Sequence, residues 1–540
     1  MTTPAPEQSA PPCVVHEDDD LLVVNKPPGW NTHAPAVHAG EGIYDWLKHR
    51  ESRWSRLAIV HRLDKDTSGL MVFGKTAQAN RSLTGQFTKR RVRKQYTLVT
   101  DRPVPRDTFT VLSEIVRDGD RYLARPLTQE GDRAETHFRV LRREGAQTWL
   151  AAEPVTGRTH QIRVHAAAEG LPILGDRLYG GSAASRLHLH ATALEFAHPR
   201  SGDTVRLTSL PDFLTPASRQ LREAVIGRSC TNTFREIHGA ADGKPASYQE
   251  RLGAWLLLDG EEAPVASEAS ALVGSGGGTL PVRGVYFKRL LRQVTRASAT
   301  EAAPQLLAGE PAPPRFPVRE HGVSYELSVT EGYSVGLFLD QRDNRRRLLC
   351  GHVAAEFPLY AGEQNPAPEV LNCFAYTCAF SVCAALGGAR VTSLDLSRKY
   401  LDWGRRNFEL NGLDPAAHDF IYGDVFDWLK RLAKKSRSYA VILLDPPTYS
   451  HSPGHGDFRC DTDYGRLVSL ALPLLQPDGV LLASTNMARL MPEPFIAQVH
   501  AAIRGAGRQI IQEHYVPQPP DFPVTREEPA HLKTLWLRIS

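Results

Sequence analysis

Several features are scarce in this sequence of 540 residues, and each scarcity excludes a class of protein. Its seven cysteines are too few for a disulfide framework. None of them forms a Cys-x-x-Cys pair, so we expect no structural zinc site and no other metal. No run of about 20 apolar residues could span a membrane, and the first residues lack the basic patch and apolar core of a signal peptide. We therefore expect a cytoplasmic protein with a disordered tail at residues 1–12.

Net charge is also low, at +4, and does not by itself indicate a nucleic-acid partner. Its local distribution is more informative, because the stretch from Arg81 to Lys94 holds six basic residues and no acid, shortly before Tyr96. Basic side chains beside an aromatic ring suit a phosphate backbone with a stacked base. The alternative is a solvated helix face, which charged runs commonly form.

The chain is too long for one ordinary core, so two or three domains are expected. Residues 13–228 contain short apolar runs separated by Gly, Pro and Asp. Three of these runs, 21–24, 96–99 and 148–150, are typical strands. This part should be an α+β domain built mainly on antiparallel sheet.

The nonapeptide from His61 to Gly69 is polar and lies between the apolar runs 57–60 and 70–73. A carboxylate at such a position is held by rigid backbone on both sides, and Gly69 permits a tight return. Asp64 is therefore the first candidate for a catalytic residue. The alternative is an Asp that caps a turn, with Arg62 as an ordinary surface partner.

This segment, with its Arg-Leu-Asp, closely resembles the signature of the RluA-type pseudouridine synthases. Four further blocks match in the same order, which disfavours the turn alternative: residues 25–29, 94–96, 157–165 and 174–180. The resemblance covers roughly the first two fifths of the chain. It implies the pseudouridine synthase fold, here without room for the usual N-terminal S4 module, and a reaction that needs no cofactor.

By this resemblance Asp64 is the nucleophile, and it must be ionised although we expect it to be buried, so it needs a neighbouring cation. The resemblance assigns that role to Arg163. The alternative is an ordinary residue of an alternating strand over residues 161–165, which is disfavoured because an arginine on the core side of a strand needs a buried partner. Tyr96 would stack on the uracil, and Arg62 would hold the place of the flipped-out nucleotide. Contacts to RNA are expected from Arg158, His160 and Gln161.

Residues 229–320 are harder to interpret. The stretch 233–243 resembles the opening of the small domain that precedes the catalytic domain in ribosomal RNA methyltransferases of the RlmI/RlmK type. Residues 274–278 lack the helix and lysine of a phosphate-binding loop and are predicted to be a linker. The Ala- and Pro-rich residues 299–317 are predicted to be a second hinge.

From residue 321 to 540 strands alternate with helices, which predicts an α/β domain with a doubly wound parallel sheet. Expected strands are 370–374, 391–395 and 439–445, and Ser397 should cap a helix that runs to about Leu410. Ligands of such sheets bind beyond the carboxyl ends of the strands. Asp395, Asp424 and Asp445 all lie at such ends.

This half resembles class I S-adenosylmethionine-dependent methyltransferases with a Rossmann-like fold, and most closely the RlmI/RlmK group. The matching blocks are residues 336–342, 372–377, 387–389 and 445–450. The resemblance implies S-adenosylmethionine as cofactor, with Asp395 on the ribose hydroxyls and Asp424 near the adenine amino group. The full set of expected cofactor residues is Asp340, Gln341, Arg342, Asn372, Phe374, Tyr376, Thr377, Asp395, Asp424 and Asp445.

Two departures from the family pattern bear on the chemistry. Cys378 replaces a glycine, and its side chain could crowd the methionine part of the cofactor. Methylation of pyrimidine carbon 5 needs a cysteine thiolate, but the run 481–486 and Pro447 carry none where the family places one, and Cys460 is too distant in sequence to be preferred. Asn486 matches the RlmK-like members instead. We therefore expect guanine N7 as the methyl acceptor, ahead of an exocyclic amine, in a pocket formed by Pro446, Pro447, Thr448 and Asn486.

Together these patterns predict a bifunctional RNA-modifying enzyme, a pseudouridine synthase fused to a base methyltransferase, that acts on large-subunit ribosomal RNA. Two alternatives stay open. The C-terminal half could be a degenerate RNA-binding module, or the substrate could be transfer RNA.

Overall fold

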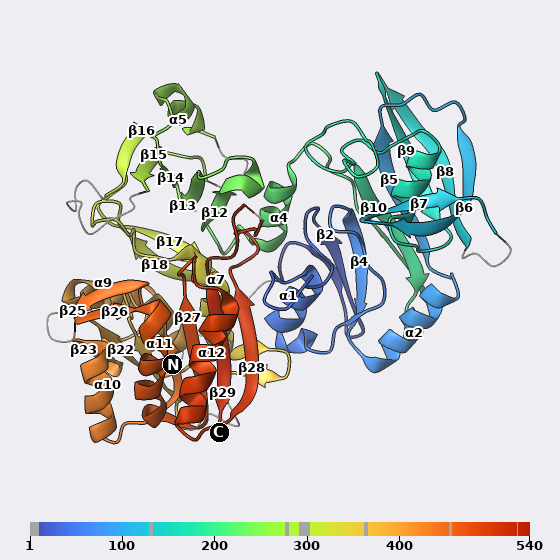
Figure 1. The fold of residues 1–540 in the computed structure, drawn as a ribbon. Helices are drawn as coiled ribbons and strands as arrows, with labels where there is room; N and C mark the ends of the chain where they lie inside the picture. Colours follow the sequence, from blue (N-terminus) through green and yellow to red (C-terminus); the bar gives the residue numbers. More distant parts are fainter. Residues whose placement is uncertain are drawn as a thin grey trace.

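The computed structural model describes residues 10–128, 133–275, 280–290, 303–360, 366–452, 456–525 and 527–540. The expected tail falls largely outside these ranges, as do residues 276–278 of the expected linker. Figure 1 shows three consecutive parts of the chain, coloured from blue through green to red. No helix of the described residues is long and apolar enough to cross a bilayer.

The first part is an eleven-stranded sheet in the order β1-β2-β4-β10-β5-β9-β8-β6-β7, with β3 beside β4 and β11 beside β10. All of its pairings are antiparallel except that of β4 with β10, so the expected α+β architecture is confirmed. The strands are β1 (Val14–Glu17), β2 (Leu21–Lys26), β3 (Ala58–Ile59), β4 (Ser68–Gly74), β5 (Arg93–Thr100), β6 (Thr108–Asp118), β7 (Arg121–Arg125), β8 (Arg133–Glu144), β9 (Gln147–Pro154), β10 (Leu189–Ala197) and β11 (Thr204–Thr208). The helices are α1 (Ile43–Arg50), α2 (Ala77–Thr88), α3 (Gln161–Ala168) and α4 (Ala217–Val225).

The second part is a small five-stranded sheet, β12-β13-β14-β15-β16, and helix α5 packs against it. Its elements are β12 (Thr233–His238), β13 (Tyr248–Leu252), β14 (Trp255–Gly260), α5 (Ala266–Leu272), β15 (Gly284–Arg289) and β16 (Gln305–Gly309). A hairpin follows, β17 (Phe316–Glu320) and β18 (Val323–Leu327). The expected boundary at residue 320 thus falls inside a hairpin. The expected hinge at 299–317 is wrong for its described residues, because β16 pairs with β15 there.

The third part is a seven-stranded sheet in the order β23-β22-β21-β24-β27-β29-β28. Its first five strands are parallel and β29 is antiparallel to both neighbours, which confirms the expected α/β fold. The strands of this sheet are β21 (Glu369–Cys373), β22 (Arg390–Asp395), β23 (Asp419–Tyr422), β24 (Tyr439–Leu444), β27 (Leu475–Thr485), β28 (Ile510–Pro517) and β29 (Lys533–Ile539). Two separate hairpins are formed by β19 (His352–Ala354) with β20 (Phe357–Pro358) and by β25 (Tyr449–Ser452) with β26 (Gly456–Arg459). The helices are α7 (Arg342–Cys350), α8 (Ala379–Leu386), α9 (Arg398–Leu410), α10 (Val425–Lys434), α11 (Cys460–Ala471) and α12 (Pro492–Gly505).

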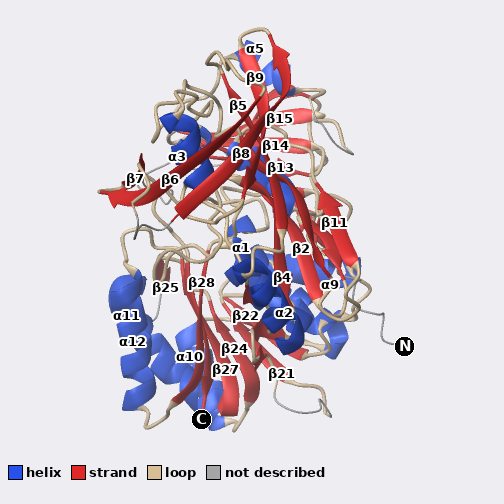
Figure 2. Ribbon diagram, turned by 90° about the vertical axis from the view of Figure 1, so that its right-hand side faces the viewer, coloured by secondary structure: helices blue, strands red, loops and turns tan. Residues whose placement is uncertain are grey.

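Strand β24 shows why this sheet needs helices on both faces. Val441 and Leu443 pack in a core that includes residues of α8 and α9, while Ile442 and Leu444 pack against α10, α11 and α12. Successive strand residues point to opposite faces, so an uninterrupted apolar run can be buried only in a three-layer arrangement. Figure 2 shows helices α10, α11 and α12 along this sheet. The carboxyl ends of the parallel strands are left open to form a site.

The first and third parts are joined by buried contacts between α1 and α7. Trp46 donates its indole N–H to Asp343 at 3.0 Å, and Arg346 donates to the main-chain oxygen of Arg50 and to the carboxylate of Glu51. Both donor side chains lie away from solvent, with Trp46 and Arg346 each 3% exposed. The two large domains therefore share an interface and are not joined by a linker alone.

Candidate active sites

The Asp64 loop is held in place by buried polar contacts from the N-terminal strands. The ammonium of Lys26 is completely buried and donates to the main-chain oxygens of Pro27, Trp30 and Lys65. At Gly69 the backbone has φ 117°, and an added Cβ would lie 2.4 Å from the main chain of Ala191 on β10. Only glycine fits such a close approach, so the loop re-enters the sheet at a fixed place.

Asp64 lies in a cavity of about 520 Å³ whose wall brings together the expected residues of the first half. Its carboxylate Oδ2 is 3.9 Å from Arg163 Nη1 and 3.9 Å from His160 Nε2. The side chain is 21% exposed, so the expectation that Asp64 is buried is wrong. Arg62 is exposed at the cavity wall.

Arg163 differs from the expectation in two respects. It lies on helix α3, and not on a strand, and its hydrogen bonds go to Asp176 rather than to Asp64. Nε donates to Asp176 Oδ2 at 2.7 Å and Nη2 to Oδ1 at 2.8 Å, while Nη1 alone is directed at Asp64. Asp176 is fully buried and was in a matched motif without an assigned role. It anchors the guanidinium whose remaining edge faces the candidate nucleophile.

Three more expected residues line this cavity with different roles. Tyr96 is partly buried, and burial together with the charge of Asp64 raises the pKa of its hydroxyl, so it stays protonated. His160 bonds Tyr179 at 2.8 Å through Nδ1, and burial lowers the pKa of its ring. Gln161 uses its whole amide on Thr156 Oγ1, the Arg158 N–H, Glu135 O and Thr136 Oγ1. It therefore supports the turn before α3 and has no free group for RNA, contrary to expectation.

The basic run contributes directly to the site. Arg90 and Lys94 line the cavity beside Tyr96, and burial lowers the pKa of Lys94. His61 also lines it but accepts the N–H of Val72 and stacks on Phe87, and burial lowers its pKa to about 3, so its part is structural.

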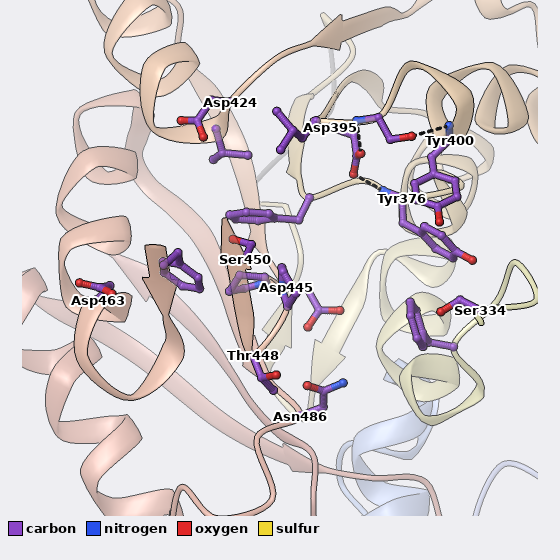
Figure 3. A pocket seen from close by; sticks show the side chains of 18 of the residues that line it. Ser334, Tyr376, Asp395, Tyr400, Asp424, Asp445, Thr448, Ser450, Asp463 and Asn486 are labelled. Carbon is purple, nitrogen blue, oxygen red and sulfur yellow. Dashed lines mark hydrogen bonds between the residues drawn. The ribbon is translucent and has the colours of Figure 1, made fainter. Parts of the chain in front are cut away.

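A second cavity, of about 690 Å³, opens at the carboxyl ends of β21, β22, β24 and β27 (Figure 3). The expected cofactor residues that line it are Asp340, Gln341, Phe374, Tyr376, Asp395, Asp424 and Asp445, and the expected base-pocket residues are Pro446, Pro447, Thr448 and Asn486. None of these residues is among those that line the Asp64 cavity. Pattern reasoning missed several other lining residues, among them Tyr333, Phe338, Tyr400, Phe426, Phe458 and Arg466.

Asp395 is fixed by two main-chain donors, drawn as dashed lines in Figure 3. Its Oδ2 accepts the Tyr376 N–H and its Oδ1 accepts the Ser397 N–H, both at 2.8 Å. Burial nevertheless raises the pKa of this carboxyl. Each oxygen keeps one lone pair for a further donor, which fits a pair of ribose hydroxyls.

Asp445 is the carboxyl of this cavity whose pKa is raised most strongly. Burial, with a contribution from the charge of Asp340, raises its pKa to about 7, although Gln341 Nε2 donates to Oδ2 at 3.0 Å. A cation in the cavity would stabilise its ionised form. The sulfonium and amino groups of S-adenosylmethionine supply such charge, so the donor set fits this cofactor.

Three expected cofactor residues are placed elsewhere. Arg342 is buried in a bidentate pair with Asp521, at 2.7 and 2.6 Å. Asn372 donates to Ser381, and Thr377 donates to the main-chain oxygen of Gly336. All three hold the walls together and do not line the cavity.

The cysteines can also be placed, since all seven lie in described ranges. Cys378 is buried against Gly404 of α9 and does not line the cavity, so its side chain is not placed to crowd a cofactor there. Cys460, judged too distant in sequence, has its Sγ 3.7 Å from Pro447 O and 3.4 Å from Thr485 Oγ1. It lies directly behind the base-pocket wall, and burial raises its pKa to about 11. Cys460 is likewise absent from the cavity lining.

One group of possible metal ligands occurs in the described residues, namely Glu41, His49 and His514, whose ligand atoms lie within 4.8 Å of one another. His49 Nδ1 already accepts the N–H of Ala355 at 3.1 Å. Its neutral ring must then carry the proton on Nε2, which is unfavourable for metal ligation there.

Comparison with known proteins finds one family in the N-terminal part of the chain and another in the C-terminal part. The family model for RNA pseudouridylate synthase matches residues 20–168, and that for S-adenosylmethionine-dependent methyltransferase matches residues 288–538. Ribosomal RNA large subunit methyltransferase I of Klebsiella pneumoniae (strain 342) is 31% identical over 58% of this chain and 75% of its own length. Ribosomal large subunit pseudouridine synthase C of Yersinia pestis is 36% identical over 40% of this chain and 68% of its own length.

A solved methyltransferase structure, SMU.776 in complex with SAH, has 26% identity and a TM-score of 0.48, and covers 57% of this chain and 76% of that chain. The sequence matches, with the two cavities each lined by its own set of motif residues, decide the family. The chain belongs to the pseudouridine synthases in its N-terminal part and to the S-adenosylmethionine-dependent ribosomal RNA large subunit methyltransferase I family in its C-terminal part.

Proposed function

We propose that this enzyme modifies large-subunit ribosomal RNA twice, converting a uridine to pseudouridine in the Asp64 cavity and methylating guanine N7 in the Asp445 cavity. The carrying observation is that the two cavities share no lining residue, and each contains the charged groups that its own chemistry needs. Both relatives are named for large-subunit ribosomal RNA, which favours that substrate over transfer RNA.

In the first cavity Asp64 acts as the nucleophile. Pseudouridine formation breaks the bond from C1′ to N1 and makes one from C1′ to C5, while C5 loses a proton and N1 gains one. The carboxylate of Asp64 can form a covalent bond to one of the two separated parts, the sugar or the uracil, while the uracil ring turns to present C5 to C1′. The 21% exposure of Asp64 leaves it reachable, and Arg163 at 3.9 Å supplies positive charge without forming a tight pair that would quench it.

Tyr96 and the basic residues position the RNA. A protonated Tyr96 offers a flat face and a hydrogen-bond donor beside Asp64. Arg62, Arg90, Lys94 and Arg158 line the same cavity and give it a positive rim for phosphates.

In the second cavity Asp395 would hold the ribose of the cofactor, and Asp424 would lie at the adenine end. S-adenosylmethionine supplies an electrophilic methyl group. Asp445 and Asp340 would face its positive charge, and Gln341 would fix the orientation of Asp445 through the 3.0 Å hydrogen bond. Orientation of a nucleophilic ring nitrogen toward the methyl group then suffices for transfer.

The acceptor assignment depends on the absence of a thiol from the wall of this cavity. Carbon-5 methylation needs a nucleophile that adds to carbon 6, and no cysteine lines the cavity, while Asn486 does. Cys460 is the alternative nucleophile, because its Sγ lies just behind Pro447. Its raised pKa keeps it as a thiol, which supports a nitrogen acceptor.

Nucleoside mass spectrometry of ribosomal RNA treated with the purified protein tests both assignments. Pseudouridine and N7-methylguanosine should form, the latter only with S-adenosylmethionine present. Formation of 5-methylcytidine would contradict the guanine assignment. Absence of any methylated nucleoside, on ribosomal RNA lacking the modification, would contradict the second activity.

A further inference from the structure

A third cavity, of about 490 Å³, lies where the small five-stranded sheet meets the methyltransferase domain. Tyr333, Ser334, Phe338 and Asp340 line both this cavity and the cofactor cavity, so the two adjoin. Asp340 also contributes to the raised pKa of Asp445. The third cavity therefore adjoins the cofactor cavity along the wall that contains Asp340.

The sheet face that borders the third cavity changes from apolar to charged along strands β14 and β15. On parallel neighbours β14 and β15, Leu257 lies opposite Tyr286, and both belong to the buried apolar core. Two residues further, on the same face, Asp259 lies opposite Lys288, with Oδ1 3.2 Å from Nζ. The alternation of strand side chains thus places an ion pair where a purely structural face would stay apolar.

A second pair extends the charged area. Arg235 of β12 lies opposite Glu250 of β13 and donates to it at 2.8 Å. The four charged side chains are between 7% and 13% exposed, and Arg235 Nε and His238 Nδ1 are buried without a partner in the described residues. Buried ion pairs seldom stabilise a fold more than apolar residues of similar volume would. All four side chains line the cavity wall, so they are placed to contact a ligand there.

The wall shared by the two cavities is aromatic. Phe338 is 47% exposed, which is unusual for a phenylalanine inside a site. Tyr333 places its ring 4.5 Å from Lys288 Nζ. Flat aromatic faces beside fixed charges are the elements that recognise an unstacked base.

We propose that this third cavity receives a nucleotide next to the target base of the methyltransferase, with Phe338 as the stacking face and Lys288 and Asp259 reading the hydrogen-bonding edge of its base. This inference rests on the proposed function. A guanine at this neighbouring position presents, on one edge, the O6 acceptor next to the N1 and N2 donors. Lys288 matches the acceptor and Asp259 the donors, and both stand side by side on adjacent strands.

Exchanging the charges of Lys288 and Asp259 distinguishes a role in RNA recognition from a role in the stability of the fold. In the double variant Lys288→Asp with Asp259→Lys, the ion pair is retained but donor and acceptor change places. Methyl transfer to RNA should fall about tenfold to hundredfold in kcat/KM, as expected for hydrogen bonds to charged groups. The melting temperature, the affinity for S-adenosylmethionine by calorimetry and the rate of pseudouridine formation should stay as in the parent. Phe338→Ala should lower kcat/KM similarly.

Lys430→Met, at an exposed lysine of α10, is the matched control and should change none of these quantities. If the parent methylates RNA and both the exchange variant and Phe338→Ala methylate it equally fast, the inference is wrong while the proposed function stands. If the exchange variant loses cofactor affinity in proportion to activity, Lys288 and Asp259 serve the cofactor and not the base. If the parent transfers no methyl group, the proposed function itself fails and the inference with it.

Discussion

Asp176→Asn tests how the synthase site is held together. The substitution keeps the shape of the side chain but removes its charge and replaces one acceptor oxygen by an NH2 group. The guanidinium of Arg163, whose side chain is 8% exposed, therefore loses its buried counter-charge and one of its two bonds of 2.7 and 2.8 Å. Its other carboxylate neighbour, Asp64, is 3.9 Å away and cannot replace Asp176 without moving. Breaking a buried pair on one side costs about 3 to 5 kcal/mol. No discount for solvent screening applies, because Asp176 is fully buried.

For a domain of this size each kcal/mol lowers the melting temperature by about 2 to 4 °C, which gives a decrease of about 6 to 20 °C for the synthase transition. Differential scanning calorimetry on the full chain measures it, because the transition of the methyltransferase domain serves as an internal reference. Pseudouridine formation should fall as well, since the cation beside Asp64 loses its anchor.

The matched control is Glu195→Gln, which removes the partly buried partner of the exposed Arg206 at 2.7 Å in the same domain and should cost at most about 1 kcal/mol. If Asp176→Asn melts like that control and turns over normally, the pair with Asp176 does not organise the site.

Four further predictions concern single side chains. Asp64→Asn should abolish pseudouridine formation, assayed by tritium release from uridine, and leave methyl transfer intact; comparable turnover would disprove the nucleophile. Asp395→Ala should weaken S-adenosylmethionine binding by a few kcal/mol, at about 1.5 to 3 for each lost hydrogen bond, without effect on the synthase; equal affinity by calorimetry would remove Asp395 from the cofactor site. Because the pKa of Asp445 is raised to about 7, its carboxylate becomes populated only as pH rises through that value. Cofactor affinity should therefore increase about tenfold from pH 6 to pH 8 with proton release at pH 6, and Asp445→Asn should remove this dependence; a flat profile in the parent would contradict the assignment. Cys460→Ala should leave the methylated nucleoside unchanged, and loss of all methyl transfer in a folded variant would restore a covalent mechanism.

Local patterns were sufficient where a segment's neighbours in sequence decide its structure. Helix α9 begins after Ser397, whose hydroxyl accepts the Tyr400 N–H, and it ends at Leu410 as predicted. The three acids at strand ends all reach one cavity because parallel strands end at the same edge of a sheet.

Prediction failed where distant segments decide. The alternation of residues 161–165 suggests a strand, but the segment forms helix α3. The side-chain amide of Gln161 forms hydrogen bonds to β8 and to the turn before the helix, and both partners are set by the tertiary structure. Cys460 is 13 residues beyond Pro447, yet the β25–β26 hairpin between them returns the chain to the same wall. The third cavity could not be predicted, because its charges become neighbours only through the register of four strands.

Helix α7 has a consequence for how the two activities can cooperate. Its four arginines are each committed to a different partner: Arg342 to Asp521, Arg345 to Glu320, Arg346 to Glu51 of the synthase domain and Arg347 to the main chain of Val353. If one catalytic domain rotated against the other, Arg346 and Trp46 would become exposed or would lose their hydrogen-bond partners. The free energy this costs disfavours independent motion of the two domains. The two sites consequently keep a set spacing. An RNA that occupies both at once must present its two nucleotides at that spacing, so the tertiary structure of the RNA, and not the reach of a tether, selects which pair of bases is modified together.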